Sequence, residues 1–469
     1  MSWMIDPDPK LLERLVREGL RGGGNWCDLY FEDTVCTDLL LRDGAVGSGG
    51  VNVDCGCGIR VLDGDRTGYA YSESLEEGAL LSAARAAASI GDGSVCAVSS
   101  AFSAAGPAPA RNFYPMREDW RSTDAARFVP ALQRLDSLIR TRDSRVHKVH
   151  AMLSSQVSEV LMYNSLGECV RDTRPMGSLS ISVVFLQDGR SETRTVSRSF
   201  RAGAEMVDET LLQELAHKAT DGLDAQFEAS RPKGGTMSVV MAAGASGILL
   251  HEAMGHAFEA DFNRKGQSVF AGRMGERVAR KGIWIYDDGT LPGNRGACNY
   301  DDEGIPGQKT CMVEDGILRS YLHDRISARH YGVTPTGNGR RESFRYNPIP
   351  RMRATYMGPG PDGTAADLIA DVKKGVYVEE FANGEVKIGE GDFTFYVKSG
   401  SLIENGRLTR PVKDINIIGN GPRALRDIVA VGGDLLIDDG AWTCGKEQSV
   451  PVSCGIPSVL VRELTVGGA

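Results

Sequence analysis

The sequence predicts an α+β protein in two parts. We expect an N-terminal α+β domain over residues 1–230 and a β-rich C-terminal domain over residues 231–469, sheet-like or barrel-like, carrying one short histidine-rich helix. Glycine supplies 57 of 469 residues, about 12% against a usual ~7%, and 19 prolines with many short apolar runs indicate turn-rich β structure. The length exceeds that of one ordinary domain. The polar segment 230–235 (SRPKGG) is the candidate boundary.

Charge and targeting signals exclude several classes of protein. The net charge is −9 with a pI of about 5.5 and no basic block, so we expect no nucleic-acid partner. The N-terminus lacks a basic segment followed by an apolar one, and no apolar run reaches the ~18 residues of a membrane span. We therefore expect a soluble, cytoplasmic protein without a membrane partner. The ten cysteines are scattered and are expected to be mostly reduced and buried.

The N-terminal part is predicted to combine helices with short strands. Apolar residues at helical spacing predict a helix over 8–20, and Ser74 followed by two glutamates predicts the start of a second helix over 74–90. Asp/Gly turns separate four predicted strands, at 28–33, 37–41, 58–62 and 68–72. An Ala/Pro-rich connector over 101–115 follows. Beyond it we expect helices at 123–140 and 208–228, and strands at 146–154, 159–164, 177–187 and 190–200.

The C-terminal part is predicted to consist of strands and glycine turns with four short helical segments. A buried strand over 237–242 leads through a Gly/Ser turn into the first of these segments. The other three are expected at 327–331, 364–374 and 421–430.

The first helical segment carries the strongest chemical signal, the motif HExxxH. His251, Glu252 and His256 supply two imidazoles and a carboxylate, as a zinc hydrolase requires for two metal ligands and a base. The spacing is one residue longer than in HExxH. On a regular helix residues five apart diverge by roughly 140°, so both histidines reach one metal only where the helix is overwound, bulged or ending. We expect Gly255 to be where such a distortion costs least.

The third ligand stays open on the residues alone. Glu259 and Asp261 lie downstream on the same segment, as in carboxylate-ligated zinc peptidases, and spacing favours them over a distant thiolate. His323, Asp324 and His330 are candidates for orienting a ligand imidazole.

A series of phrases in fixed order resembles the TldD/PmbA family, and within it the metal-binding TldD-type subunit. After HExxxH these phrases are 261–270 (DFNRKGQSVF), 301–308 (DDEGIPGQ), 334–343 (TPTGNGRRES), 350–352 (PRM), 402–406 (LIENG), 431–434 (VGGD), 444–447 (CGKE) and 464–468 (LTVGG). The match is dense from about residue 235 onward and weaker but collinear before it. The segment 334–343 is expected either to be a solvated loop or to face the peptide-binding site.

The resemblance implies a ligand set and a partner. In TldD-type subunits HExxxH and a cysteine hold the metal, which implies His251, His256 and Cys444 as zinc ligands here. Cys454 is a rival thiolate, and the phrase after Cys444 lacks one glycine of the family pattern. The family's active form is a heterodimer with a PmbA (TldE)-type subunit that degrades unfolded or extended peptides and completes peptide maturation. A homodimer remains the alternative assembly.

The leading interpretation is therefore a zinc-dependent peptidase in which Glu252 is the catalytic base. An alternative from another class is a non-catalytic, zinc-stabilised binding or scaffold protein. The two differ because a structural zinc has four protein ligands, whereas a catalytic zinc keeps an open position. A gyrase-modulating or DNA-binding role is disfavoured by the acidic charge balance.

Overall fold

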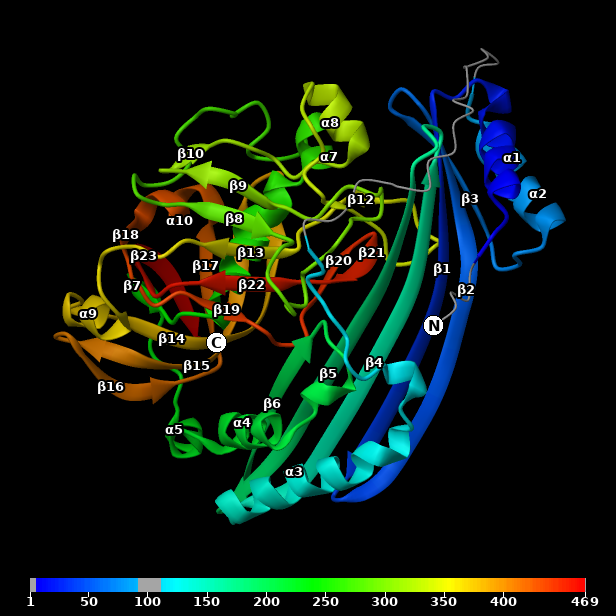
Figure 1. Cartoon of the computed structure of the whole chain (residues 1–469). Helices are drawn as coiled ribbons and strands as arrows, with labels where there is room; N and C mark the ends of the chain where they lie inside the picture. The colour runs from blue at the N-terminus through cyan, green and yellow to red at the C-terminus, as the bar shows by residue number, and fades with distance from the viewer. Residues whose placement is uncertain (1–5, 92–110, 469) are drawn as a thin grey trace.

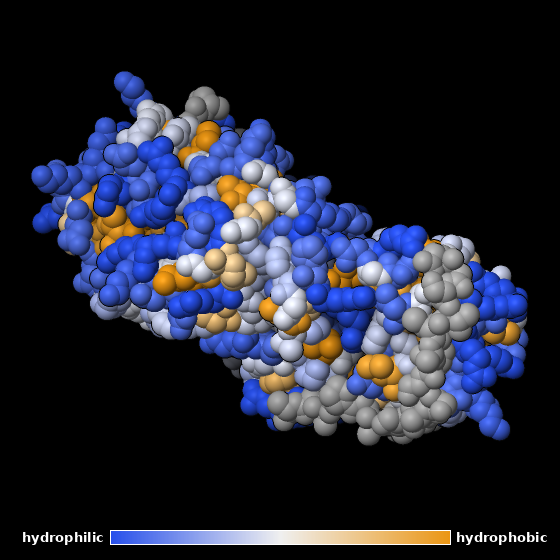
Figure 2. All heavy atoms as spheres, turned by 90° about the horizontal axis from the view of Figure 1, so that it is seen from above, coloured by the Kyte–Doolittle hydropathy of each residue, from blue (hydrophilic) through white to orange (hydrophobic). Residues whose placement is uncertain are grey.

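The computed structural model describes residues 6–91 and 111–468, and confirms an α+β protein with a β-barrel in its C-terminal part (Figure 1). Most of the predicted connector 101–115 lies outside the described residues. Seen from above, the molecule is elongated, and hydrophilic side chains dominate the visible face (Figure 2). Within the described ranges, no helix has the length and apolar character needed to cross a membrane.

The N-terminal part is built on one antiparallel sheet of six strands, in the order β3-β2-β1-β4-β5-β6. The strands are β1 (Trp26–Arg42), β2 (Ala45–Asp63), β3 (Arg66–Ser72), β4 (Val146–Asn164), β5 (Cys169–Gln187) and β6 (Arg190–Phe200). The prediction of separate strands at 28–33 and 37–41, and at 146–154 and 159–164, is wrong, because each pair forms one continuous strand. Thr34 and Ser158, in the expected breaks, hydrogen-bond across β1 and β4 at 2.7 Å instead of forming turns.

The two faces of this sheet have different coverings. Along β1, β4 and β5, odd-numbered residues such as Leu29 and Ile181 face a helical layer, while even-numbered ones such as Tyr30 and Val160 face the C-terminal part. Figure 1 shows α1 and α2 at one end of the sheet and α3 and α4 at the other. The helices are α1 (Pro9–Gly19), α2 (Glu77–Ala88), α3 (Val129–Arg142), α4 (Glu209–Thr220) and α5 (Leu223–Glu228). The predicted helix 208–228 is split at Gly222, whose φ is 70°.

The C-terminal part contains a closed barrel in the order β14-β7-β23-β17-β15, because β14 also pairs with β15. Its strands are β7 (Gly235–Met241), β14 (Lys374–Lys387), β15 (Asp392–Glu404), β17 (Ile415–Asn420) and β23 (Val459–Gly468). Strand β16 (Arg407–Val412) extends the sheet from β15, and β18 (Ile428–Val431) pairs with β23. Fully buried Val239, Val376, Phe395 and Val461 fill the interior.

A second sheet packs beside the barrel in the order β10-β9-β8-β13-β22-β19. Its strands are β8 (Ile285–Asp288), β9 (Lys309–Glu314), β10 (Ile317–Leu318), β13 (Ala354–Met357), β19 (Leu436–Asp438) and β22 (Ser453–Ile456). Two small hairpins join β11 (Gly339–Arg340) to β12 (Ile349–Pro350) and β20 (Thr443–Lys446) to β21 (Gln448–Pro451). The three predicted later helices are α8 (Arg325–Tyr331), α9 (Ala365–Ala370) and α10 (Gly421–Asp427).

Candidate metal centre

The HExxxH segment forms a bulged helix rather than a regular one. A short α-helical turn, α6 (Ile248–Leu250), leads into a π-helical turn, His251–Gly255, and then into a 3₁₀ turn, His256–Phe258. The amide of His256 donates to the carbonyl of His251, five residues earlier. A π turn therefore brings residues five apart onto one face, which is the kind of distortion that the spacing required. Helix α7 (Ala260–Arg264) follows.

Gly255 is required by packing rather than by backbone conformation. Its φ and ψ are −55° and −51°, which any residue adopts in a helix. A Cβ at this position would lie 2.0 Å from Sδ of Met352. The segment 350–352 therefore packs directly against the π turn. The expectation that Gly255 is needed for the backbone distortion is wrong, because its role is to leave room for Met352.

Three predicted ligands meet at one point. Sγ of Cys444, on β20, lies 3.1 Å from Nε2 of His251 and 3.2 Å from Nε2 of His256. The three side chains form the cluster of metal-binding type found among the described residues, with all ligand atoms within 4.8 Å of one another. Each residue is at most 5% exposed. Residues nearly two hundred positions apart are therefore gathered with their donor atoms facing one another.

The electrostatics of the cluster favour a thiolate. Burial alone would raise the pKa of the Cys444 thiol, but the neighbouring His251 and His256 lower it to about 4. The thiolate is the form of cysteine that binds metals. Nδ1 of His256 lies 2.9 Å from Oε2 of Glu259, so Nε2, on the other side of the ring, faces the cluster.

Glu259 and Asp261 lie behind the cluster rather than in it. Glu259 is fully buried, and the ammonium of Lys446 lies 3.1 Å from its Oε2 and 2.8 Å from Oδ1 of Asp261. Burial alone would raise the pKa of Glu259, but Lys446 and His256 bring it down to about 2. Both carboxylates that spacing offered as third ligands therefore have ion-pair partners. Of the two, Glu259 contacts Nδ1 of His256 and is therefore placed to orient that imidazole.

Lys446 and Arg351 are functional candidates that the sequence reasoning missed. The guanidinium of Arg351 is fully buried and donates to the carbonyls of Cys444 at 2.7 Å and Gln448 at 2.8 Å, one on each strand of the hairpin. Both residues lie in phrases already singled out, 350–352 and 444–447. The signal in the sequence was a cation within each phrase, but spacing alone does not identify the buried groups that these cations contact.

The β20–β21 hairpin turns at Glu447, which has a φ of 57°. This is the place where the chain lacks a glycine of the family phrase, and a glutamate adopts the left-handed conformation instead. Cys454, the rival thiolate, lies on β22 and pairs with Thr355 of β13. Burial raises the pKa of Cys454 well above its ordinary value, so it remains a thiol.

Glu252 lies at the opening of the cluster. Together with His256, Gly445 and Lys446 it lines a cavity of about 450 Å³, whose other wall is the β14 segment 384–386 and Ile388. Burial raises the pKa of Glu252. The arrangement places a half-buried carboxylate beside a His/His/Cys cluster at the mouth of a cavity, which is suited to activating water.

The other predicted polar residues lie apart from this cluster. Asp324 caps α8, accepting from the amide of Ser327 at 2.8 Å, and His330 is exposed. His323 is buried against Tyr331, and burial lowers its pKa to about 4. In the segment 334–343, Arg340 and Arg341 are buried at the junction with the first sheet, so a fully solvated loop is not what forms there.

Comparison with known proteins places the chain in a family. Residues 234–468 match the model of the PmbA/TldA metallopeptidase C-terminal domain. Residues 27–91 match domain 1 and residues 118–223 match the central domain of the same family. Together the matches extend over most of the chain.

Individual relatives agree with this placement. A metalloprotease TldD homolog from Haemophilus influenzae is 39% identical over 95% of this chain and 93% of its own. A zinc metalloprotease TldD homolog from Saccharolobus solfataricus is 35% identical over 52% of this chain and 54% of its own. The crystal structure of TldE from Thermococcus kodakarensis shares the fold, with a TM-score of 0.77 and 18% identity over 98% of this chain and all of that one (100%). The chain therefore belongs to the PmbA/TldD family of metallopeptidases.

Proposed function

We propose that the protein is a zinc-dependent peptidase that hydrolyses unfolded or extended peptides, as the catalytic subunit of a TldD–TldE-like heterodimer. The observation that carries the proposal is the convergence of His251, His256 and Cys444, with ligand atoms within 4.8 Å of one another, beside Glu252. A TldD-type relative carries the name zinc metalloprotease. The proposed setting is the cytoplasm.

The residues present fit a zinc ion. Two imidazole nitrogens and one thiolate are ligands that zinc prefers, and three protein ligands leave a position open, as in catalytic sites. Glu259 contacts Nδ1 of His256, as the outer partner of a ligating histidine does. A zinc ion held there would polarise a peptide carbonyl and lower the pKa of water.

In the proposed reaction Glu252 moves the proton. Its carboxylate, lining the cavity, accepts a proton from the attacking water and then delivers it to the nitrogen of the leaving amine. Lys446 and Arg351 would act as positioning residues. Lys446 holds Glu259 behind His256, and Arg351 holds the hairpin that presents Cys444.

The wall of the cavity suggests how an extended peptide would bind. Strand β14 pairs with β15 at 384–387, while β7 pairs with β14 at 375–378. The second edge of β14 at 384–386 has no strand partner in the described part of the chain and borders the cavity with Glu252. A peptide added to this edge would be held by its backbone, with little dependence on side chains. Folded proteins would be excluded because their backbone is already paired.

Metal content and peptidase activity test the proposal together. Wild type and Glu252→Ala should each bind one zinc per chain, and only wild type should cleave unstructured peptides. A general base contributes roughly 10²–10⁴-fold to rate. Each protein should be assayed alone and mixed with a PmbA-like partner, since activity that appears only on mixing would support the heterodimer. Zinc bound without cleavage under any condition would favour the structural-zinc alternative.

A further inference from the structure

A second cavity, of about 240 Å³, lies between the first sheet and the C-terminal part. It is separate from the metal cluster but shares an element with it, because Thr443, Ser449 and Pro451 of the β20–β21 hairpin line its wall. Side chains alternate along a strand, so Thr443 and Cys444 point to opposite faces of the hairpin. The hairpin thus has the metal cluster on one side and this cavity on the other.

The lining of this cavity is strongly cationic. It contains three carboxylates, from Glu32, Asp302 and Glu342. It contains six guanidinium groups, from Arg174, Arg201, Arg295, Arg340, Arg341 and Arg353. Burial raises the pKa of Glu32 to about 7, so this carboxyl is partly protonated at neutral pH and offsets less of the positive charge.

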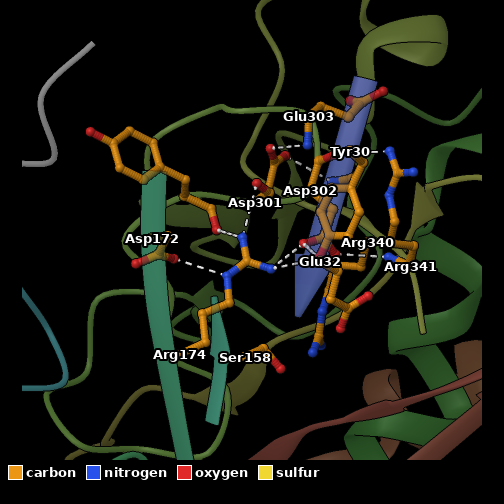
Figure 3. A network of polar contacts seen from close by, with 12 residues as sticks. Tyr30, Glu32, Ser158, Asp172, Arg174, Asp301, Asp302, Glu303, Arg340 and Arg341 are labelled. Carbon is orange, nitrogen blue, oxygen red and sulfur yellow. Dashed lines mark hydrogen bonds and ion pairs between the residues drawn. The ribbon is translucent and has the colours of Figure 1, made fainter. Parts of the chain in front are cut away.

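Two of the six arginines have carboxylate partners. Figure 3 shows Arg174 of β5 reaching Asp172 on one side and Asp302 on the other, and Nε of Arg174 lies 2.9 Å from Oδ2 of Asp172. Nη2 of Arg341 lies 3.6 Å from Oδ1 of Asp28. The positive charges of these two guanidinium groups are therefore balanced by carboxylates of the protein.

The other four arginines bond only to neutral groups within the described residues. Arg340 donates to the carbonyls of Met352 at 2.5 Å and Pro451 at 2.8 Å. Arg295 donates to the carbonyl of Trp442 at 2.8 Å and to the hydroxyls of Ser178, Ser199 and Thr443. Arg353 and Arg201 each donate to one carbonyl, those of Gly337 and Arg295.

Buried positive charge without an ion-pair partner is unfavourable unless an anion joins it. Arg340 is 4% exposed and Arg295 is 8% exposed. Burial and the charge of Arg353 hold the pKa of Arg340 well below its ordinary value. Burial and Arg201 lower the pKa of Arg295 to about 10. The guanidinium groups therefore repel one another in a space that is large enough for a small ligand.

We propose that this cavity is a binding site for a small oxyanion, a phosphate or a carboxylate group, held by Arg201, Arg295 and Arg340. Guanidinium groups bind both kinds of oxyanion through paired N–H donors. Arg295 bonds to Trp442 and Thr443 just before Cys444, and Arg340 bonds to Pro451 on the other strand. The bound anion would therefore fix both strands of the hairpin that carries Cys444.

The test uses the full-length chain in phosphate-free buffer. Inorganic phosphate is titrated at constant ionic strength, and binding heat and the midpoint of thermal unfolding are measured. We expect saturable heat and a midpoint that rises with phosphate concentration, since a ligand of the folded state stabilises it. Sodium chloride at matched ionic strength should have no such effect. A wild-type protein without heat and without a shift in phosphate would overturn the proposal.

Matched variants locate the site. Arg201→Gln removes a cation that donates a hydrogen bond to the carbonyl of Arg295, and we expect the phosphate affinity of this variant to fall about tenfold or more. Arg407→Gln, on the exposed strand β16, makes the same change of net charge and should bind phosphate as wild type does. Arg340→Lys keeps the charge but loses the paired donors, and should also weaken binding. Equal affinity in Arg201→Gln, Arg340→Lys and Arg407→Gln would contradict the assignment.

A competition experiment distinguishes the two sources of anion. An unstructured peptide with a free C-terminal carboxylate and the same peptide as a C-terminal amide are each added to the phosphate complex of Glu252→Ala. Displacement by the acid alone identifies a peptide carboxylate as the ligand. Retention of phosphate against both peptides identifies a free oxyanion.

Discussion

The first sheet and the metal cluster differ in what holds them together. In the sheet, β1 pairs with β4 in one unbroken register from Asp28 to Arg42, and alternation decides which side chains face the helices. The cluster instead joins a π turn to a hairpin 188 residues later, and is supported by single buried contacts from Met352, Arg351 and Lys446. Repeated local pattern specifies the first region, whereas individual long-range contacts specify the second. Changes in the two regions should therefore have separable effects.

The largest expected effect on stability comes from the sheet core. Phe185 is fully buried between the sheet and its helices, so Phe185→Ala should lower the free energy of unfolding by about 3–5 kcal/mol. The folded fraction should keep its zinc content and its activity per molecule. Denaturant unfolding and metal analysis measure the two properties. Loss of zinc at temperatures where the variant is folded would show that the regions are coupled.

The next effect is a pH-dependent change in the free energy of unfolding that arises on only one face of the sheet. Burial raises the pKa of Glu32 from 4.5 to about 7 on the face toward the C-terminal part, with Asp302 raising it and Arg174 lowering it. The folded state favours the protonated form, so wild type loses this contribution as pH rises from about 4.5 to about 7. Glutamine does not titrate, so Glu32→Gln does not lose stability in this way. Its stability relative to wild type should thus improve by up to about 3 kcal/mol across this window.

Unfolding of both proteins by denaturant at pH 4.5 and pH 8, in phosphate-free buffer, measures this difference. The other titrating groups contribute equally to the stability of the two proteins, so their contributions cancel in the difference. A stability difference that does not change between the two pH values would contradict the assigned pKa.

A smaller effect is expected from Gly255→Ala. The new methyl group would meet Sδ of Met352 at 2.0 Å, so the π turn or the methionine must move, at a cost of about 1–3 kcal/mol. Zinc affinity should fall because the turn carries His251. The double variant with Met352→Ala removes the clash and should recover zinc binding. Equal zinc affinity in wild type and Gly255→Ala would show that the turn tolerates the displacement.

The smallest effect is expected at the hairpin turn. Glu447 has a φ of 57°, a conformation that costs an ordinary residue about 1 kcal/mol more than glycine. Glycine also increases the entropy of the unfolded chain, which offsets part of the gain. Glu447→Gly should therefore change the free energy of unfolding by less than about 1 kcal/mol and leave zinc affinity unaltered. A large loss of stability would mean that the glutamate side chain has a role of its own.

Sequence periodicity was enough for much of the fold. The apolar spacing of 8–20 predicted α1, and the predicted strand 190–200 matches β6. The predicted breaks within β1 and β4 were wrong, because polar residues such as Thr34 and Ser158 are satisfied by one another across strands. Isolated polar residues in an apolar run do not distinguish a turn from a polar contact at a buried interface.

The candidate site was predictable in part. The HExxxH spacing required a distorted helix, and a π turn is present. Spacing alone favoured Glu259 and Asp261 over a cysteine, but Lys446 pairs with both carboxylates. No local pattern identifies such a partner 185 residues away. The burial of Arg340 and Arg341 was likewise invisible, because two adjacent arginines in a Gly-rich segment usually indicate an exposed loop.

The most direct test of the proposed catalytic centre is the coordination of zinc in the wild-type protein, measured by X-ray absorption at the zinc edge. An open catalytic site predicts one sulfur ligand at about 2.3 Å, two imidazole nitrogens at about 2.0–2.1 Å and one further light-atom ligand from solvent. Cys444→Ser should remove the sulfur signal, and Cys454→Ser should leave it unchanged. Four protein ligands around the zinc, or a sulfur signal that survives in Cys444→Ser, would contradict the account.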